Sequence, residues 1–233
     1  MPLLLDAYHI GDPLFLTGLA RDLAARQAEA GPGGAVLVHG SGERGERALE
    51  ALGVLPESEG GVWVTATDEQ AGAVERATRA LGREIVHELN EAGVSAVRVL
   101  GADRGLVRAT VGGGAVGKTG WLKTLVGQGV VAVVASLVAP PGGAADGVPL
   151  AEADPAAMAA ALGEALGEPV GVLLKRGLSS ADGGISVSDA SARAALGDAA
   201  GAGRLVASGA RVVAVPRGAL RGAWAGTGTP VTA

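Results

Sequence analysis

A glycine-rich turn between an apolar segment and a helix is the first feature of this chain that could do chemistry. Gly40, Ser41 and Gly42 follow the apolar residues 35–38, and a helical pattern covers residues 43–52. A strand that enters a helix through glycines leaves backbone N–H groups without intrahelical partners, and such groups suit an anion. The pattern therefore predicts a phosphate-binding turn.

A second stretch, from Gly112 to Thr119, satisfies the P-loop pattern G-x-x-x-x-G-K-[ST], with Lys118 as its lysine. A P-loop nucleotidase also needs an acidic residue at the end of a later apolar strand, to help hold Mg²⁺. The next apolar segment, residues 130–136, ends without one. With 40 glycines in 233 residues, the pattern also arises easily by chance. We therefore favour the alternative, a tight glycine-rich hairpin before a helix.

Composition narrows the classes of protein that remain. A hydrophobic fraction of 48% supports a core, but aromatics are only 2%, so the core must consist of Val, Leu and Ala. A formal net charge of −5 gives no electrostatic support for a nucleic-acid partner. The chain has no cysteine, which excludes a thiol nucleophile and a cysteine metal site. No apolar run reaches about 18 residues and no signal-peptide pattern is found, so we expect a cytoplasmic protein without a membrane partner.

Expected strands and helices alternate along the chain. The strands are expected at residues 2–5, 35–38, 95–100, 130–136, 170–174 and 211–215, and the helices at 13–30, 43–52, 68–92, 119–128, 154–166 and 190–208. This alternation predicts an α/β fold, a three-layer αβα sandwich with a central, mostly parallel sheet. A Pro/Gly loop and lower charge near residue 140 indicate one domain, 1–233, with lobes at 1–140 and 141–233.

Short motifs follow one another in a specific order. They are Val38-His39-Gly40-Ser41-Gly42, Gly61-Val62-Trp63-Val64-Thr65-Ala66, residues 83–93, Leu100-Gly101-Ala102-Asp103, Gly114-Ala115-Val116-Gly117 and Gly226-Thr227-Gly228-Thr229. This order resembles that of the amino-acid kinase family, most closely the acetylglutamate kinases and the related aminoadipate-pathway kinases. The resemblance covers nearly the whole chain and implies the fold of that family.

The resemblance implies phosphoryl transfer from ATP, with Mg²⁺, to a carboxylate, as in arginine or lysine biosynthesis. Such catalysis consists mainly of positioning and of neutralising negative charge. Carried over by motif, the expected phosphate contacts are Gly40, Ser41, Gly42 and Gly11; the catalytic aspartate is Asp154; and the pocket for an acidic substrate contains Trp63, Thr65 and Glu152. The resemblance also places the acid substrate in lobe 1–140 and the nucleotide in lobe 141–233.

This chain departs from the family pattern at positions that the family uses for catalysis and substrate binding. Asp6 stands where the first lysine is expected, and the second lysine falls near Asp198. Trp63 replaces the substrate-binding arginine, and Glu152 lies where the family has an asparagine motif. Two carboxylates in place of two cations would repel a triphosphate by several kcal/mol in a dry site.

These departures leave three interpretations open. A working kinase would need relocated cations, and Arg204 or Lys118 could reach in from the side. A non-catalytic paralogue would bind a metabolite or pair with a true kinase subunit. A changed site would bring Asp6, Asp154 and Asp198 together around Mg²⁺ or Mn²⁺. We favour the second, an acetylglutamate kinase-like protein with weakened or lost transfer and no metal site of its own.

Several singled-out residues also have structural alternatives. Asp154 could be only a helix N-cap, Asp103 only a turn residue, and His39 only a hydrogen-bonded buried histidine. Trp63 could fill the substrate pocket, although we favour its covering an interface. His9 and His87 lack partners at metal-ligand spacing and are predicted to lie on the surface.

A homodimer is the expected assembly. The family resemblance implies pairing through the long helix, residues 68–92. That helix carries an apolar stripe that could serve either the core or a partner, made of Val74, Ala77, Leu81, Ile85 and Leu89.

Overall fold

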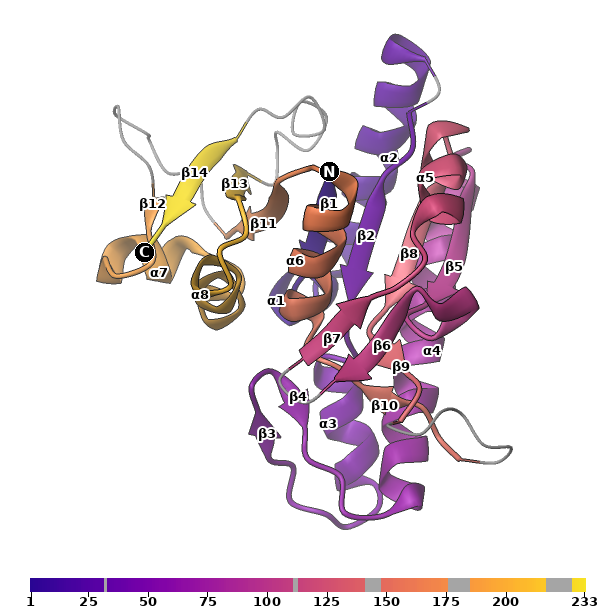
Figure 1. The fold of residues 1–233 in the computed structure, drawn as a ribbon, viewed down its shortest axis with the longest axis vertical. Helices are drawn as coiled ribbons and strands as arrows, with labels where there is room; N and C mark the ends of the chain where they lie inside the picture. The colour runs from indigo at the N-terminus through magenta and orange to yellow at the C-terminus, as the bar shows by residue number, and fades with distance from the viewer. Residues whose placement is uncertain (32, 111–112, 141–147, 176–184, 217–227) are drawn as a thin grey trace.

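A twisted sheet forms the centre of the computed structural model, which describes residues 1–31, 33–110, 113–140, 148–175, 185–216 and 228–233 (Figure 1). Within these ranges the sheet has eight strands in the order β12-β14-β13-β11-β1-β2-β8-β5. Neighbouring strands run parallel except for the antiparallel pair β13–β14. The strands are β1 (Pro2–Leu5), β2 (Val36–His39), β5 (Ala96–Leu100), β8 (Val131–Ala135), β11 (Val170–Leu174), β12 (Ile185–Ser186), β13 (Val212–Pro216) and β14 (Thr229–Thr232).

Helices cover both faces of this sheet, because alternate side chains of the buried strands point to opposite sides. Leu3 and Leu5 of β1 pack in one apolar cluster with α2 (Pro13–Ala30) and α4 (Asp68–Glu91). Leu4 packs in the other cluster, with α5 (Gly120–Gly127), α6 (Pro155–Leu166) and α8 (Ala199–Ala207). In Figure 1, α6 lies in front of β1 and β2. The predicted three-layer αβα sandwich is confirmed.

Local capping explains where the C-terminal helices begin and end. Helix α6 follows Asp154, whose carboxylate accepts a hydrogen bond from the Ala156 N–H at 3.0 Å, and it closes at Gly167 in the left-handed region. The single helix predicted over 190–208 is instead two, α7 (Ala190–Ala195) and α8. It is interrupted because the Gly197 N–H donates to the Leu173 carbonyl of β11 at 2.8 Å.

Short elements decorate the ends of the sheet. They are α1 (Ala7–Ile10), α3 (Glu43–Glu50), the 3₁₀ turn Asp103–Gly105, and three antiparallel pairs: β3 (Ser58–Glu59) with β4 (Val62–Trp63), β6 (Val107–Thr110) with β7 (Gly113–Val116), and β9 (Leu137–Val138) with β10 (Ala151–Glu152). None of the helices in the described ranges is long and apolar enough to cross a membrane.

The P-loop interpretation of Gly112 to Thr119 is wrong. Residues 113–116 form β7 and pair antiparallel with β6, whereas a P-loop wraps a phosphate between a strand and a helix. The next two backbone N–H groups, of Gly117 and Lys118, donate to the Leu106 and Gly105 carbonyls, and Lys118 is exposed. The alternative hairpin prediction is confirmed, while Gly112 lies outside the described residues.

The apolar stripe of the long helix belongs to the core. Val74, Leu81, Ile85 and Leu89 of α4 are each at most 2% exposed, and Ala77 is half-buried. The stripe is therefore not a free surface for a partner. The homodimer through this helix stays a prediction.

Candidate functional site

A cleft of about 450 Å³ opens at the carboxyl ends of β1 and β2. In a parallel sheet the carboxyl ends of the strands form the usual edge for ligands. The β3–β4 hairpin, the start of α6 and the start of α8 complete its walls. The cleft brings together these residues selected from the sequence: Asp6, Gly40, Ser41, Gly42, Trp63, Glu152, Asp198 and Arg204.

The glycine turn forms the base of the cleft as the sequence predicts. Gly42 has φ 53° and precedes α3, which has no side-chain cap. The Ser41 N–H, however, is not free: it donates to Glu152 Oε1, and Ser41 Oγ donates to Glu152 Oε2 at 3.0 Å. The Trp63 backbone N–H donates to the same carboxylate. The Glu152 carboxyl group therefore occupies the Ser41 donors of a turn that would suit a phosphate.

Burial raises the pKa of Glu152 to about 7, against the opposing effect of the hydrogen bonds from Ser41 and Trp63. The carboxyl group is thus close to half protonated at neutral pH. Glu152 was expected in an acid-substrate pocket. It lies in the cleft, yet its partner is the glycine turn.

Trp63 closes over the same turn. Its indole Nε1 donates to the Gly42 carbonyl at 3.2 Å. Its ring packs against Gly45, where an added Cβ would lie only 2.7 Å from Cδ1. Trp63 is half-buried and lines the cleft, which agrees with the alternative that it fills the pocket, while its covering an interface stays a prediction.

Asp6 is paired with a histidine that sequence reasoning placed wrongly. His9 is 1% exposed, not on the surface, and its Nδ1 lies 2.8 Å from Asp6 Oδ2. His9 Nε2 lies 3.3 Å from the Leu174 carbonyl at the end of β11. Asp6 also caps α1 by accepting the His9 N–H at 3.0 Å. The i, i+3 spacing of Asp6 and His9 at the start of a helix indicates their pairing, but no sequence pattern indicates the contact of His9 with Leu174. His87, by contrast, is exposed as predicted.

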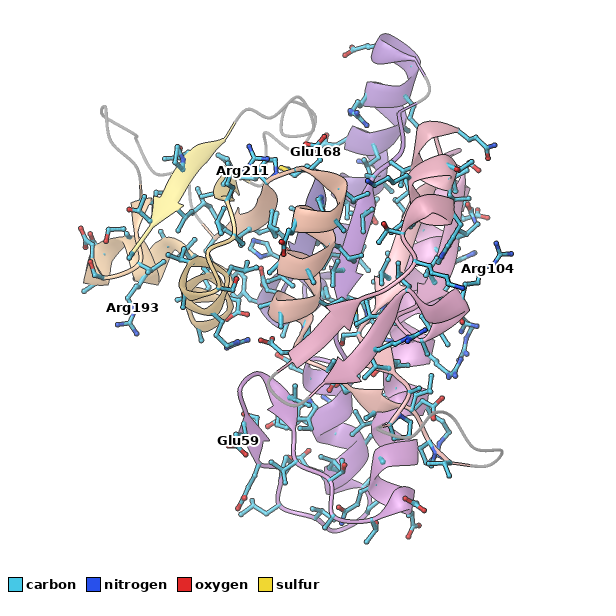
Figure 2. All side chains as sticks on the ribbon, viewed as in Figure 1. Glu59, Arg104, Glu168, Arg193 and Arg211 are labelled. Atoms are coloured by element: carbon cyan, nitrogen blue, oxygen red, sulfur yellow. The ribbon has the colours of Figure 1, made fainter. Side chains whose placement is uncertain are left out.

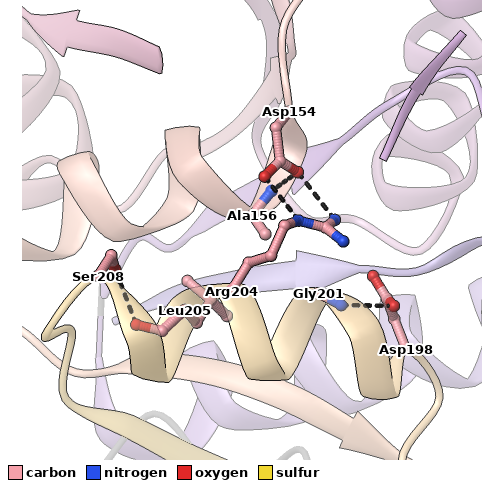
Figure 3. A network of polar contacts seen from close by, with 7 residues as sticks. All are labelled: Asp154, Ala156, Asp198, Gly201, Arg204, Leu205 and Ser208. Atoms are coloured by element: carbon pink, nitrogen blue, oxygen red, sulfur yellow. Dashed lines mark hydrogen bonds and ion pairs between the residues drawn. The ribbon is translucent and has the colours of Figure 1, made fainter. Parts of the chain in front are cut away.

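Asp154 and Arg204 form a bidentate ion pair at the cleft wall (Figure 3). Arg204 Nε lies 2.8 Å from Asp154 Oδ2, and its terminal nitrogen lies 3.0 Å from Oδ1. The Asp154 carboxylate raises the pKa of Arg204 further. Asp198, at the expected second lysine position, caps α8 by accepting the Gly201 N–H at 2.7 Å. Asp154 therefore has both an N-cap role and an ionic partner.

The metal hypothesis for Asp6, Asp154 and Asp198 is wrong. Each of these carboxylates has a different partner, and the described residues contain no group of three His, Cys, Asp or Glu placed to hold a metal ion.

Two residues of the predicted site lie elsewhere. Thr65 is half-buried and does not line the cleft. Gly11 lines a neighbouring cavity of about 260 Å³ between α1, α3 and α4, and its N–H donates to the Ala7 carbonyl. Of the two cations proposed as replacements, Arg204 lines the cleft and Lys118 does not. Of the late motif, residues 226–227 lie outside the described residues, and Thr229 begins β14.

His39 and Asp103 have the structural roles that were considered for them. His39 is fully buried, its Nδ1 donates to the Gly40 carbonyl at 3.0 Å, and burial lowers its pKa to about 4. It is therefore neutral, and its Nε2 has no partner among the described residues. Asp103 accepts the Leu100 N–H at 2.8 Å in a turn.

Comparison with known proteins identifies the fold of this chain. No protein-family model matches this chain. The structure of smu.665 from Streptococcus mutans UA159 superposes with a TM-score of 0.67 at 19% identity, over 99% of this chain and 97% of that one. An isopentenyl phosphate kinase gives 0.63 at 15% identity, over 99% and 98%. An N-acetylglutamate synthase from Neisseria gonorrhoeae, complexed with coenzyme A and N-acetyl-glutamate, gives 0.66 at 18% identity, over 99% of this chain and 58% of the synthase.

The chain therefore has the amino-acid kinase-like fold that was predicted. At these identities the likeness establishes the fold alone. The roles assigned to individual site residues stay predictions.

Proposed function

We propose that this chain binds a small polar metabolite in the cleft beside its glycine turn and transfers phosphate weakly or not at all. The observation that carries this proposal is the contact of Glu152 with the Ser41 N–H. That N–H belongs to the turn at which an incoming phosphate would be expected to bind. A ligand phosphate must displace an internal carboxylate before it can use this donor.

The charges of the described cleft residues argue against a nucleoside triphosphate at this turn. Asp6 and Asp198 stand at the two expected lysine positions, and each lines the cleft. The Arg204 guanidinium is already bound by Asp154. Phosphoryl transfer depends on cations and donors that neutralise the transferring group. The scarcity of such cations and donors in the cleft supports ligand binding without phosphoryl transfer.

A second candidate is ATP-dependent phosphorylation of a carboxylate to an acyl phosphate, as in acetylglutamate kinases. Two observations favour it: Arg204 lines the cleft, and the raised pKa of Glu152 lets that group become neutral near pH 7. A neutral Glu152 would compete less strongly for the Ser41 N–H. This candidate also requires Arg204 to leave Asp154.

Calorimetric titration with MgATP, with and without N-acetylglutamate, tests the two candidates, followed by hydroxamate trapping of acyl phosphate on the same sample. We expect no MgATP binding below millimolar concentration and no hydroxamate. Micromolar nucleotide binding with hydroxamate formation would overturn the proposal in favour of the kinase.

The role of Glu152 is tested by Glu152→Ala, which frees the Ser41 N–H. We expect this variant to bind inorganic phosphate about tenfold more tightly than the wild type, equal to about 1.4 kcal/mol. Glu59→Ala is the matched control, because Glu59 is an exposed acid on the β3–β4 hairpin outside the cleft lining (Figure 2). Equal phosphate affinity in both variants would show that Glu152 does not block the turn.

A further inference from the structure

The cleft is rich in carboxylates and poor in available cations. Among its described lining residues, Arg204 is the only lysine or arginine, and Asp154 already binds it through two hydrogen bonds. The lining carboxylates are Asp6, Glu43, Glu46, Glu152 and Asp198. An anionic ligand would meet like charge on most sides, whereas a cation would gain Coulomb energy in a partly dry site.

Not all of these carboxylates have a basic side chain as a partner. Asp6 has His9, and Glu43 lies 3.3 Å from Arg47 at the surface. Glu46, which is half-buried on α3, has no hydrogen-bond or ion-pair partner among the described residues. Glu152 has hydrogen-bond donors from Ser41 and Trp63 but no cation. Asp198 caps α8 and lies close enough to Arg204 to raise the pKa of that group, so Glu46 and Glu152 are the lining carboxyl groups without a basic partner among the described residues.

The raised pKa of Glu152 is the consequence expected of this arrangement. Burial without a neighbouring cation disfavours the charged form. A ligand cation beside Glu152 would offset the cost of burying the charged carboxylate. The carboxylate would in turn attract the cation. The same is not true of a ligand carboxylate, which would raise the cost further.

Trp63 adds an aromatic surface to the same wall. Its indole is fixed by the hydrogen bond to the Gly42 carbonyl and by contact with Gly45. Tryptophan is the side chain that attracts ammonium and guanidinium groups most strongly through its ring. Carboxylates and an indole ring each attract an ammonium group, and a cleft of about 450 Å³ is large enough for a small amine.

We propose that the ligand of this cleft carries an ammonium or similar cationic group, bound between Glu46, Glu152 and Trp63. The inference rests on the proposed binding function and names the ligand class. It differs from the acidic metabolite that the sequence resemblance implies, because the one lysine or arginine among the described lining residues is already paired with Asp154 and the other charged residues there are acids.

Three linear probes of matched length test the charge preference: 1,5-diaminopentane, glutarate and 1,5-pentanediol. Each is titrated calorimetrically into the wild-type chain at pH 8 and low salt. We expect the diamine to bind at least tenfold more tightly than the dicarboxylate, with affinity that falls as salt is added. Tighter binding of glutarate or of the diol would overturn the inference and leave the proposed metabolite-binding function standing. Failure of all three probes to bind would also overturn the inference.

Variants place the diamine in the cleft. Glu46→Gln keeps the size of a side chain that has no described partner, so we expect it to fold normally and to bind the diamine several-fold more weakly. Glu59→Gln removes one charge outside the cleft lining and is expected to bind as the wild type does. Equal losses in both variants would show a general surface attraction and overturn the inference. MgATP binding with hydroxamate formation would instead overturn the proposed function, so the two failures are distinguishable.

Discussion

Two buried titratable groups flank the glycine turn and are shifted by the same cause. Burial lowers the pKa of His39 from 6.5 to about 4 and raises the pKa of Glu152 from 4.5 to about 7. Between pH 4 and 6.5 the unfolded chain holds a proton on His39 that the folded chain lacks, so this residue makes stability rise with pH. Between pH 4.5 and 7 the folded chain holds a proton on Glu152 that the unfolded chain lacks, so this residue makes stability fall with pH.

Replacing Glu152 with Gln removes its contribution to the pH dependence of stability and leaves that of His39. We expect the free energy of unfolding of Glu152→Gln, relative to the wild type, to rise by about 2–3 kcal/mol between pH 4.5 and 7. Urea denaturation at a series of pH values measures the difference, and Glu59→Gln serves as control. A difference that does not change with pH would mean that Glu152 titrates near its ordinary pKa in the folded chain.

At the element scale, the β3–β4 hairpin covers the cleft and depends on two adjacent glycines. Gly60 has φ 58° and Gly61 has φ 83°, conformations that L side chains rarely adopt. Their surroundings differ. A Cβ on Gly60 would meet nothing within 4 Å, whereas a Cβ on Gly61 would overlap the Arg204 guanidinium beside Asp154.

Alanine at these two positions separates backbone strain from contact with Arg204. We expect Gly60→Ala to lower the free energy of unfolding by about 1–2 kcal/mol through strain alone. Gly61→Ala should cost about 1–3 kcal/mol more and weaken ligand binding, because the hairpin must move off the Arg204–Asp154 pair. Denaturation and ligand titration of both variants check this. Equal losses would show that the hairpin does not rest on that pair.

At the scale of the whole molecule, the sheet runs without a break through both predicted lobes. β1 of lobe 1–140 pairs with β2 on one side and with β11 of lobe 141–233 on the other. Helix α6 of the second lobe packs in the same apolar cluster as Leu4 of β1 and Val36 and Val38 of β2. Separating the lobes would therefore expose the middle of the core.

We accordingly expect the chain to unfold in a single cooperative transition. In a Trp224→Phe variant, tryptophan fluorescence reports Trp63 and Trp121 of the first lobe alone, and far-ultraviolet circular dichroism reports the helices of both lobes. The two signals should give the same midpoint in urea. Separate midpoints would show that the lobes fold independently, despite the shared sheet.

The sequence by itself determined the elements and their layers. Alternating apolar segments, helix caps such as Asp154 and the glycine-rich hairpin are local patterns, so they predicted the αβα sandwich and favoured a hairpin over a P-loop. Local patterns gave wrong predictions where a contact with a segment distant in the sequence decides the structure. The helix over 190–208 is broken at Gly197 by β11, and His9 is buried beneath the Leu174 carbonyl.

Only the tertiary structure decided which charges in the cleft are satisfied. Motif order predicted that Gly40, Trp63, Glu152 and Asp198 belong to one site, because the order of strands fixes where their ends meet. It could not show that Glu152 binds Ser41 across 111 residues or that Arg204 binds Asp154 across 50. Such pairings depend on side-chain positions at the meeting of separate loops, which no local spacing encodes. They leave Glu46 and Glu152 without a cation and so give the cleft its chemical character.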